Sequence, residues 1–212
     1  AHGADIISDL AVQIDENVVD NTEIGWKVTE DALPWRQWTK SVPRDYVVPT
    51  YDSVPDEECT KRLVGGYTRT IYPEAVFDSK QEKWVATILE REDATVRAWV
   101  RIPVGQMPIF YGTGDYNPDF LADTGETVYI LEVKARKDLE DVDVQRKARA
   151  AVAWCKAADG LCGRKWEYVL IPHDAVQPTD SFAGVLSRAY SLADDGGFDP
   201  ENDSVADSSP TT

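Results

Sequence analysis

The segment YNPDFLADTGETVYILEVKA, residues 116–135, carries charged side chains where two β-strands are expected. Asp119 lies near its start, and Glu132 and Lys134 lie two positions apart near its end. Side chains two positions apart on a strand project from the same face, so Glu132 and Lys134 are expected to lie together. Charged side chains at positions where a strand normally carries apolar residues suggest a functional role.

The turn expected at DTGET, residues 123–127, determines which residues of the two strands face each other. If the turn centres near Gly125, antiparallel pairing joins residues whose numbers sum to about 250. Asp119 then lies opposite Glu132 or its neighbour, on the same face of the sheet. We therefore expect two carboxylates and one ammonium group to converge at one point.

Two carboxylates this close repel each other and raise each other's pKa unless positive charge lies between them. A hard divalent cation with oxygen ligands meets this need, so we expect a Mg²⁺ site at Asp119 and Glu132, in which Mn²⁺ can substitute. Lys134 beside the metal can orient a metal-activated hydroxide, or stabilise the charge that grows on a phosphate. The expected chemistry is phosphodiester hydrolysis.

Several further elements must position this hairpin. Ser79 and Glu82 stand at capping-box spacing before apolar residues that recur with helical period, which predicts a helix over about 79–92. An Ala-rich stretch predicts a second helix over 142–160, with Asp141 or Asp143 as N-cap and Gly160 at its end. The remaining expected elements are strands at 95–103, 108–111 and 166–172 and a last amphipathic helix at 181–193.

The order of these elements is helix, three strands, helix, strand. We expect a mixed α/β fold in which a central mixed sheet is flanked by helices. We divide the chain into an acidic flank or linker over residues 1–65, a core domain over 66–193 and a disordered acidic tail over 194–212. In the flank, EIGWKVT and DYVVPTY have strand character, but four prolines interrupt the pattern.

The net charge of −16 argues at first against a nucleic-acid partner, because phosphate binding depends largely on Lys and Arg. The charge is unevenly distributed, however. Residues 61–172 carry 17 acidic and 17 basic side chains, so the excess of acid lies in the two flanks. A basic groove in the middle of the chain is therefore compatible with the composition.

The chain has no apolar run of the roughly 20 residues needed to cross a membrane, so we expect a soluble, cytoplasmic protein with no membrane partner. Its three cysteines, Cys59, Cys155 and Cys162, form no C-x-x-C pair and are expected to be reduced thiols. The chain starts with Ala1 and contains one methionine, which suggests a processed product or a piece of a longer protein.

The motifs quoted above resemble the PD-(D/E)xK nuclease superfamily. FDSKQEKWVATILE, YNPDF, ILEVKA, KARAAVAWC and WEYVLIPHD, within about residues 66–180, look more specifically like the carboxy-terminal nuclease domain of type III restriction endonuclease Res subunits and related helicase-nucleases. The resemblance implies Mg²⁺-dependent cleavage of DNA in a restriction-modification system that acts in phage defence. It also implies upstream ATP-driven helicase domains and a modification subunit as partners.

Carried over by position, this resemblance makes Asp119 and Glu132 the metal ligands and Lys134 the catalytic lysine. Glu82 matches an acidic residue on the first helix that can join the metal site, although a capping-box role alone also explains it. The chain contains no G-x-x-x-x-G-K-[ST] stretch, so any ATPase would belong to sequence outside it. The first 60 residues match no family pattern.

Charged and polar residues after the catalytic strand are candidates for contact with the nucleic-acid backbone. Lys147 and Gln145 on the second helix can reach phosphates at the edge of the site, and Arg136 and Lys137 directly follow the strand that bears Lys134. The alternative for all four is a solvated helix end and a charged loop.

Other functions remain open at this stage. A non-catalytic docking or regulatory module can keep the same fold and use the acidic flanks to bind a protein. A repair nuclease or resolvase that acts on branched or single strands is a second alternative, and an RNA target is a third.

Overall fold

A four-stranded mixed sheet forms the centre of the computed structural model, which describes residues 47–92 and 94–192 and four short strands between residues 12 and 30. The strand order is β10-β9-β8-β5, in which β9 and β10 are parallel and the other pairs antiparallel. The strands are β5 (Ala98–Arg101), β8 (Phe120–Asp123), β9 (Thr127–Lys134) and β10 (Lys165–Pro172).

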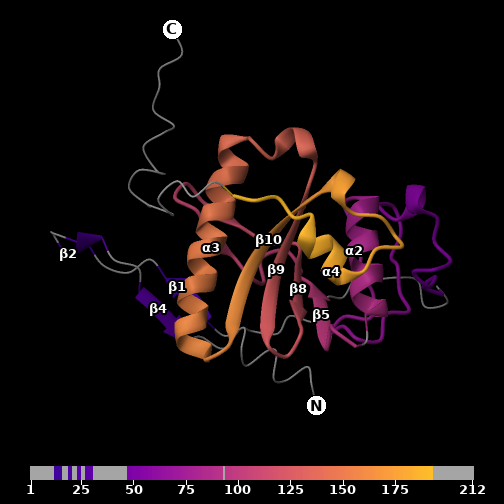
Figure 1. The fold of residues 1–212 in the computed structure, drawn as a ribbon, viewed down its shortest axis with the longest axis horizontal. Helices are drawn as coiled ribbons and strands as arrows, with labels where there is room; N and C mark the ends of the chain where they lie inside the picture. Colours follow the sequence, from indigo (N-terminus) through magenta and orange to yellow (C-terminus); the bar gives the residue numbers. More distant parts are fainter. Residues whose placement is uncertain are drawn as a thin grey trace, which may run out of the picture.

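The two long helices, α2 (Lys80–Arg91) and α3 (Val142–Cys162), cover opposite faces of this sheet (Figure 1). Strand side chains alternate between the two faces. Leu131 and Val133 therefore pack with the apolar face of α2, whereas Ile130 packs in a second cluster with Trp154 of α3. The predicted mixed α/β class, with helices flanking a central mixed sheet, is confirmed.

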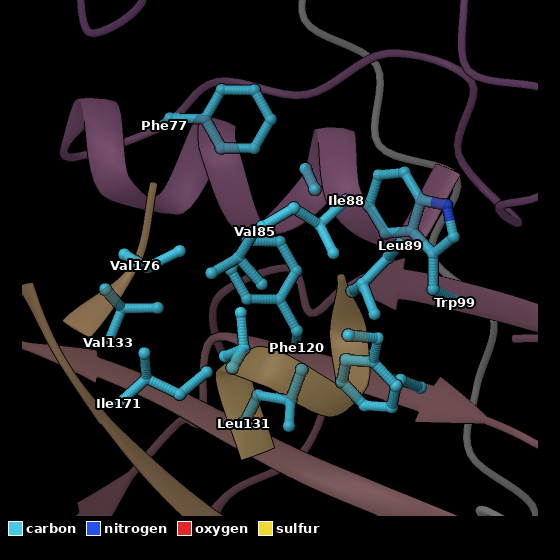
Figure 2. Packing of buried hydrophobic residues seen from close by; sticks show 14 of the residues in the cluster. Phe77, Val85, Ile88, Leu89, Trp99, Phe120, Leu131, Val133, Ile171 and Val176 are labelled. Atoms are coloured by element: carbon cyan, nitrogen blue, oxygen red, sulfur yellow. The ribbon is translucent and has the colours of Figure 1, made fainter. Parts of the chain in front are cut away.

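The helix α2 begins where the capping-box spacing predicts. Ser79 is its N-cap, and the Ser79 hydroxyl accepts a hydrogen bond from the backbone N–H of Glu82 at 3.2 Å. Beyond the cap, buried apolar residues of α2 point toward Phe120 and Leu131 of the sheet, as Figure 2 shows for Val85, Ile88 and Leu89. Glu82 occupies the same sheet-facing side of α2 and is only 5% exposed.

The helix α3 also begins as predicted but ends later. Asp141 is the N-cap and accepts hydrogen bonds from the N–H groups of Asp143 and Val144. The predicted end at Gly160 is wrong, because this exposed glycine lies within the helix. The C-cap is Gly163, whose φ of +62° is the left-handed conformation that glycine adopts at low cost.

Two short elements differ from the sequence predictions. The strand predicted at 108–111 exists as β6 (Ile109–Phe110), but it pairs with β7 (Asp115–Tyr116) in a separate hairpin outside the central sheet. The predicted last helix is only six residues long, α4 (Phe182–Ser187), and Ser181 caps it.

Residues 47–65, which the sequence analysis assigns to the flank, pack against α2. Val54, Cys59 and Val64 belong to the same buried cluster as the apolar face of α2. The ammonium group of Lys83 lies 2.8 Å from a carboxylate oxygen of Asp56, and the indole of Trp84 donates to the other oxygen at 2.7 Å. The packed unit therefore includes chain that precedes residue 66.

Between residues 12 and 30, four short strands form two antiparallel strand pairs. The expected strand at EIGWKVT corresponds in part to β3 and β4, whereas DYVVPTY forms only an isolated bridge at Thr50 within its described residues. The tail over 194–212 lies outside the described residues. The pairs are β1 (Val12–Asp15) with β4 (Lys27–Glu30) and β2 (Val19–Asp20) with β3 (Glu23–Ile24).

Two of the cysteines, Cys59 and Cys155, are free and buried, in agreement with the predicted reduced thiols. Within the part of the chain that the structure describes, no helix has both the length and the apolar character needed to cross a membrane.

The packing of α2 on the sheet predicts which substitutions in this helix lower the stability of the fold. We expect Leu89→Ala to lower the free energy of unfolding by about 2–5 kcal/mol, because Leu89 is fully buried between α2 and the sheet. Arg91→Ala, at an exposed position of the same helix, should cost much less. Urea denaturation monitored by circular dichroism measures both, and equal losses would contradict the packing described.

Candidate active site

Asp119 and Glu132 lie directly opposite each other at one end of the central sheet. The β8–β9 register pairs Phe120 with Leu131 and Leu121 with Ile130, so the next pair along is Asp119 and Glu132. A carboxylate oxygen of Asp119 also accepts a hydrogen bond from the backbone N–H of Val133 at 2.8 Å. The cross-strand arrangement expected from the sequence is therefore present.

Lys134 completes the group. Its ammonium nitrogen lies 2.9 Å from Oε1 of Glu132. Burial alone would lower the pKa of Lys134, but Glu132 and Asp119 outweigh it and the net shift of the pKa is upward. Lys134 is therefore fully charged at neutral pH and acts as a fixed cation beside the carboxylates.

The pKa values of both carboxyl groups, Asp119 and Glu132, lie above their usual values. Burial raises the pKa of Asp119 well above its usual value, and the charges of Glu132 and Glu82 raise it further. Burial likewise raises the pKa of Glu132, and Lys134 only partly opposes this shift. Both carboxyl groups thus lack enough positive charge from the protein to compensate them.

Glu82 reaches the same end of the sheet from the first turn of α2. Its Oε1 accepts from the Ser79 hydroxyl at 3.1 Å, and its Oε2 lies 2.8 Å from Nη2 of Arg101. Oε2 also accepts from the backbone N–H of Asp78 at 3.2 Å. Glu82 therefore combines the predicted capping role with an ion pair, while its charge raises the pKa of Asp119.

The residues proposed to contact phosphate are positioned differently from one another. Lys147 lies 2.5 Å from a carboxylate oxygen of Asp143 and 5.0 Å from the ring centre of Tyr111, and it lowers the pKa of Glu132. Lys147 is thus close enough to act on the site.

The other three candidates lie around the loop that follows β9. Gln145 donates to the backbone carbonyl of Leu139 at 2.5 Å and so closes this loop. Arg136 is exposed and pairs with Asp174 at 2.6 Å, and Lys137 is exposed.

Three further residues belong to this region, although no sequence pattern singled them out: Arg101, Tyr116 and Tyr168. Arg101 ends β5 and pairs with Glu82 of α2, the helix on that face of the sheet. Burial, followed by the charges of Glu132 and Asp119, raises the pKa of the Tyr168 hydroxyl. Burial also raises the pKa of Tyr116, followed by the effects of Tyr168 and Glu132. Alternation along β5 and β10 indicates on which face of the sheet Arg101 and Tyr168 lie, but the local sequence does not encode which partner each meets there.

His173 directly follows β10, next to the pair of Pro172 and Lys134. Burial lowers its pKa, and the charge of Glu82 partly opposes that shift. Its imidazole is therefore neutral at pH 7.

The carboxylates fit a divalent metal ion in one specific respect. Oε2 of Glu132 is buried and has no hydrogen-bond partner within the described part of the chain. Among the described residues, no three His, Cys, Asp or Glu side chains converge as a complete ligand set. Mg²⁺, however, commonly takes only one or two carboxylates and keeps several waters, so Asp119 and Glu132 are sufficient.

A family model described as an endonuclease domain matches residues 68–160. The matched region contains Glu82, Asp119, Glu132, Lys134 and Lys147. No curated protein and no solved structure matches the chain. The match supports a restriction-endonuclease-like nuclease, and the mixed α/β fold is consistent with that class of domain.

The raised pKa of Asp119 predicts how stability depends on pH. A carboxyl group whose pKa is higher in the folded than in the unfolded chain binds more protons when folded, so stability falls as pH rises between the two pKa values. Above the folded pKa the full penalty remains. In the absence of metal, Asp119→Asn should therefore raise the melting temperature at neutral pH.

At a pH below the unfolded pKa of about 3.9, this advantage of Asp119→Asn should vanish. Thermal melts in EDTA across pH 3–8 measure the difference. Asp174→Asn, at an exposed aspartate, serves as the control and should show no stabilisation at neutral pH. A wild-type protein that is more stable than Asp119→Asn at pH 7 without metal would contradict the assignment.

Proposed function

We propose that this domain is a Mg²⁺-dependent deoxyribonuclease that hydrolyses phosphodiester bonds where β8 begins and β9 ends. The observation that carries the proposal is the convergence of Asp119, Glu132 and Lys134, with a buried oxygen of Glu132 left without a partner. Such a cluster costs stability, and its chemistry matches the needs of phosphoryl transfer. The endonuclease-domain match supports the same conclusion.

Asp119 and Glu132 would hold the ion, which when bound supplies a Lewis acid and lowers the pKa of water. The Val133 N–H fixes one oxygen of Asp119, so its carboxylate is oriented before any ligand arrives. Lys134 stays protonated beside Glu132 and stabilises the negative charge that develops on the phosphate in the transition state. Its 2.9 Å contact with Glu132 keeps the ammonium group at the site.

Lys147 is the residue that we propose to bind a flanking phosphate. Its ammonium group lies over the Tyr111 ring in a cation–π contact, and its charge already lowers the pKa of Glu132. Because residues 61–172 are electrically neutral overall, we expect weak binding of DNA by this chain alone. Stronger engagement would then come from other domains.

The resemblance to type III restriction enzymes supports a proposal about the larger protein in which this domain acts. We propose that it acts as the nuclease part of a larger helicase-nuclease, in which ATP is used by separate motor domains and a modification subunit accompanies the assembly. The measurable consequence is that cleavage by this chain alone is slow at physiological salt. Efficient cutting by the isolated chain would argue against this context while leaving the nuclease assignment intact.

The nuclease proposal predicts a set of inactive variants. Lys134→Met should lower the kcat of Mg²⁺-dependent cleavage by about 10²–10³-fold, because it removes a charge that acts on the transition state. Asp119→Asn and Glu132→Gln should abolish metal-dependent cleavage. Gel assays of nicking on plasmid DNA, with and without EDTA, measure these effects.

The matched control for these variants is Asp174→Asn, which lies after the neighbouring strand and pairs with Arg136 outside the cluster. It should cleave like the wild type. Full activity of Asp119→Asn would refute the nuclease proposal and favour a docking module on the same fold. Linear duplex, branched and single-stranded DNA and RNA, compared in parallel, identify the preferred substrate.

The proposed phosphate contact of Lys147 is tested by the salt dependence of DNA binding. Lys147→Ala should weaken binding of all sequences similarly and reduce the slope of log K against log[salt] by about 1. Lys156→Ala, at an exposed position further along α3, is the control and should leave the slope unchanged. Fluorescence anisotropy at several salt concentrations provides the measurement, and equal slopes for all three proteins would exclude the contact.

A further inference from the structure

Arg101 places a positive charge between the first turn of α2 and the carboxylate pair. Its Nη2 lies 2.8 Å from Oε2 of Glu82 and 2.9 Å from Oδ2 of Asp78. Its charge also lowers the pKa of Asp119, against the stronger effects of burial and of the neighbouring carboxylates. Arg101 therefore belongs electrostatically to the site, although it lies on the α2 side of the sheet over the Phe120 ring.

A metal ion and Arg101 would compete for Glu82. One oxygen of Glu82 is taken by the Ser79 hydroxyl, and the other by Arg101 and the Asp78 N–H. A carboxylate in this arrangement has little remaining capacity to ligate a cation.

Arg101 has one hydrogen-bond donor without a partner among the described residues, and it borders a cavity. Its Nε is buried and has no hydrogen-bond partner among the described residues. The side chain borders a cavity of about 190 Å³, whose other walls include Tyr72, Ala75 and Val104. Ile102 also lines this cavity, and its backbone N–H donates to the carbonyl of Asp119, so the cavity adjoins the carboxylate site.

We propose that Arg101 withholds Glu82 from the metal in the DNA-free protein and releases it when a DNA phosphate becomes its new partner. This inference rests on the metal site of the proposed function. A guanidinium group can bind phosphate through two parallel hydrogen bonds, which would use the Nε that is now unpaired. Metal and DNA then bind with positive coupling, since each favours the state in which Glu82 faces the metal.

The probe for this proposal is Mn²⁺ alone, titrated into the DNA-free protein and followed by the electron paramagnetic resonance signal of the unbound ion. Arg101→Gln should bind Mn²⁺ roughly 3- to 10-fold more tightly than the wild type, because Glu82 is freed and a nearby positive charge is removed. Unchanged or weaker binding would overturn the proposal.

Arg164→Gln is the matched control. Arg164 pairs with the buried carboxylate of Asp123 at the opposite end of β8, so this substitution removes the same charge from a similar strand-end pair. Its Mn²⁺ affinity should equal that of the wild type. A gain as large as that of Arg101→Gln would show a general charge effect and overturn the proposal.

The double variant Glu82→Gln/Arg101→Gln keeps the proposal testable if Arg101→Gln does not fold. It leaves no unpaired buried charge and has the same net charge as the wild type. We expect wild-type Mn²⁺ affinity, because Glu82 makes no contact with the metal in the DNA-free protein. A loss of affinity of tenfold or more would mean that Glu82 already ligates the ion, and would overturn the proposal.

The release step is tested in a Lys134→Met background, in which the proposed function predicts that DNA stays uncut. A short DNA duplex should strengthen Mn²⁺ binding by Lys134→Met more than binding by Lys134→Met/Arg101→Gln. Equal strengthening would overturn the release step. A wild-type protein that binds no Mn²⁺ would instead refute the metal site itself, so the two failures are distinguishable.

Discussion

The need to hold Asp119 and Glu132 side by side and largely out of water constrains this end of the sheet. Neither carboxylate is fully compensated. Burial and the charge of Glu82 raise both pKa values, and Glu132 raises that of Asp119 further, although Lys134 lowers the pKa of Glu132 and Arg101 that of Asp119. Burying these two carboxylates destabilises the fold, so other parts of the structure must supply the stabilising free energy. It comes from the buried clusters on both faces of the sheet, which include Trp99 and Ile130.

The parts of this structure that could be predicted from the sequence are those that local rules determine. The β8–β9 register follows from a two-residue strand period and a turn with Gly125 at φ +90°, so Asp119 could be placed opposite Glu132 from the sequence alone. The starts of α2 and α3 follow from Ser79 and Asp141, since an N-cap satisfies backbone donors within its own turn.

The parts that could not be predicted depend on contacts distant in the sequence. The end of α3 is a separate case, because two glycines near it could each end a helix: Gly160 stays within α3, and Gly163 takes the left-handed C-cap conformation. The strand β6 has an apolar pattern typical of a core strand, yet pattern alone does not choose a partner strand. Arg101 could not be linked to Glu82, because that pair joins the end of β5 to the start of α2, 19 positions away.

Glu82 shows how a local rule and a distant contact combine at one residue. The capping interaction that fixes its backbone runs from its own N–H to the Ser79 hydroxyl, whereas the pair with Arg101 uses its carboxylate. These two interactions involve different atoms, so the carboxylate can change partner while the N-terminal turn of α2 keeps its main cap. A structural role for Glu82 in the helix is therefore compatible with a role at the metal site, and exchange of Arg101 for a cation does not require α2 to unwind.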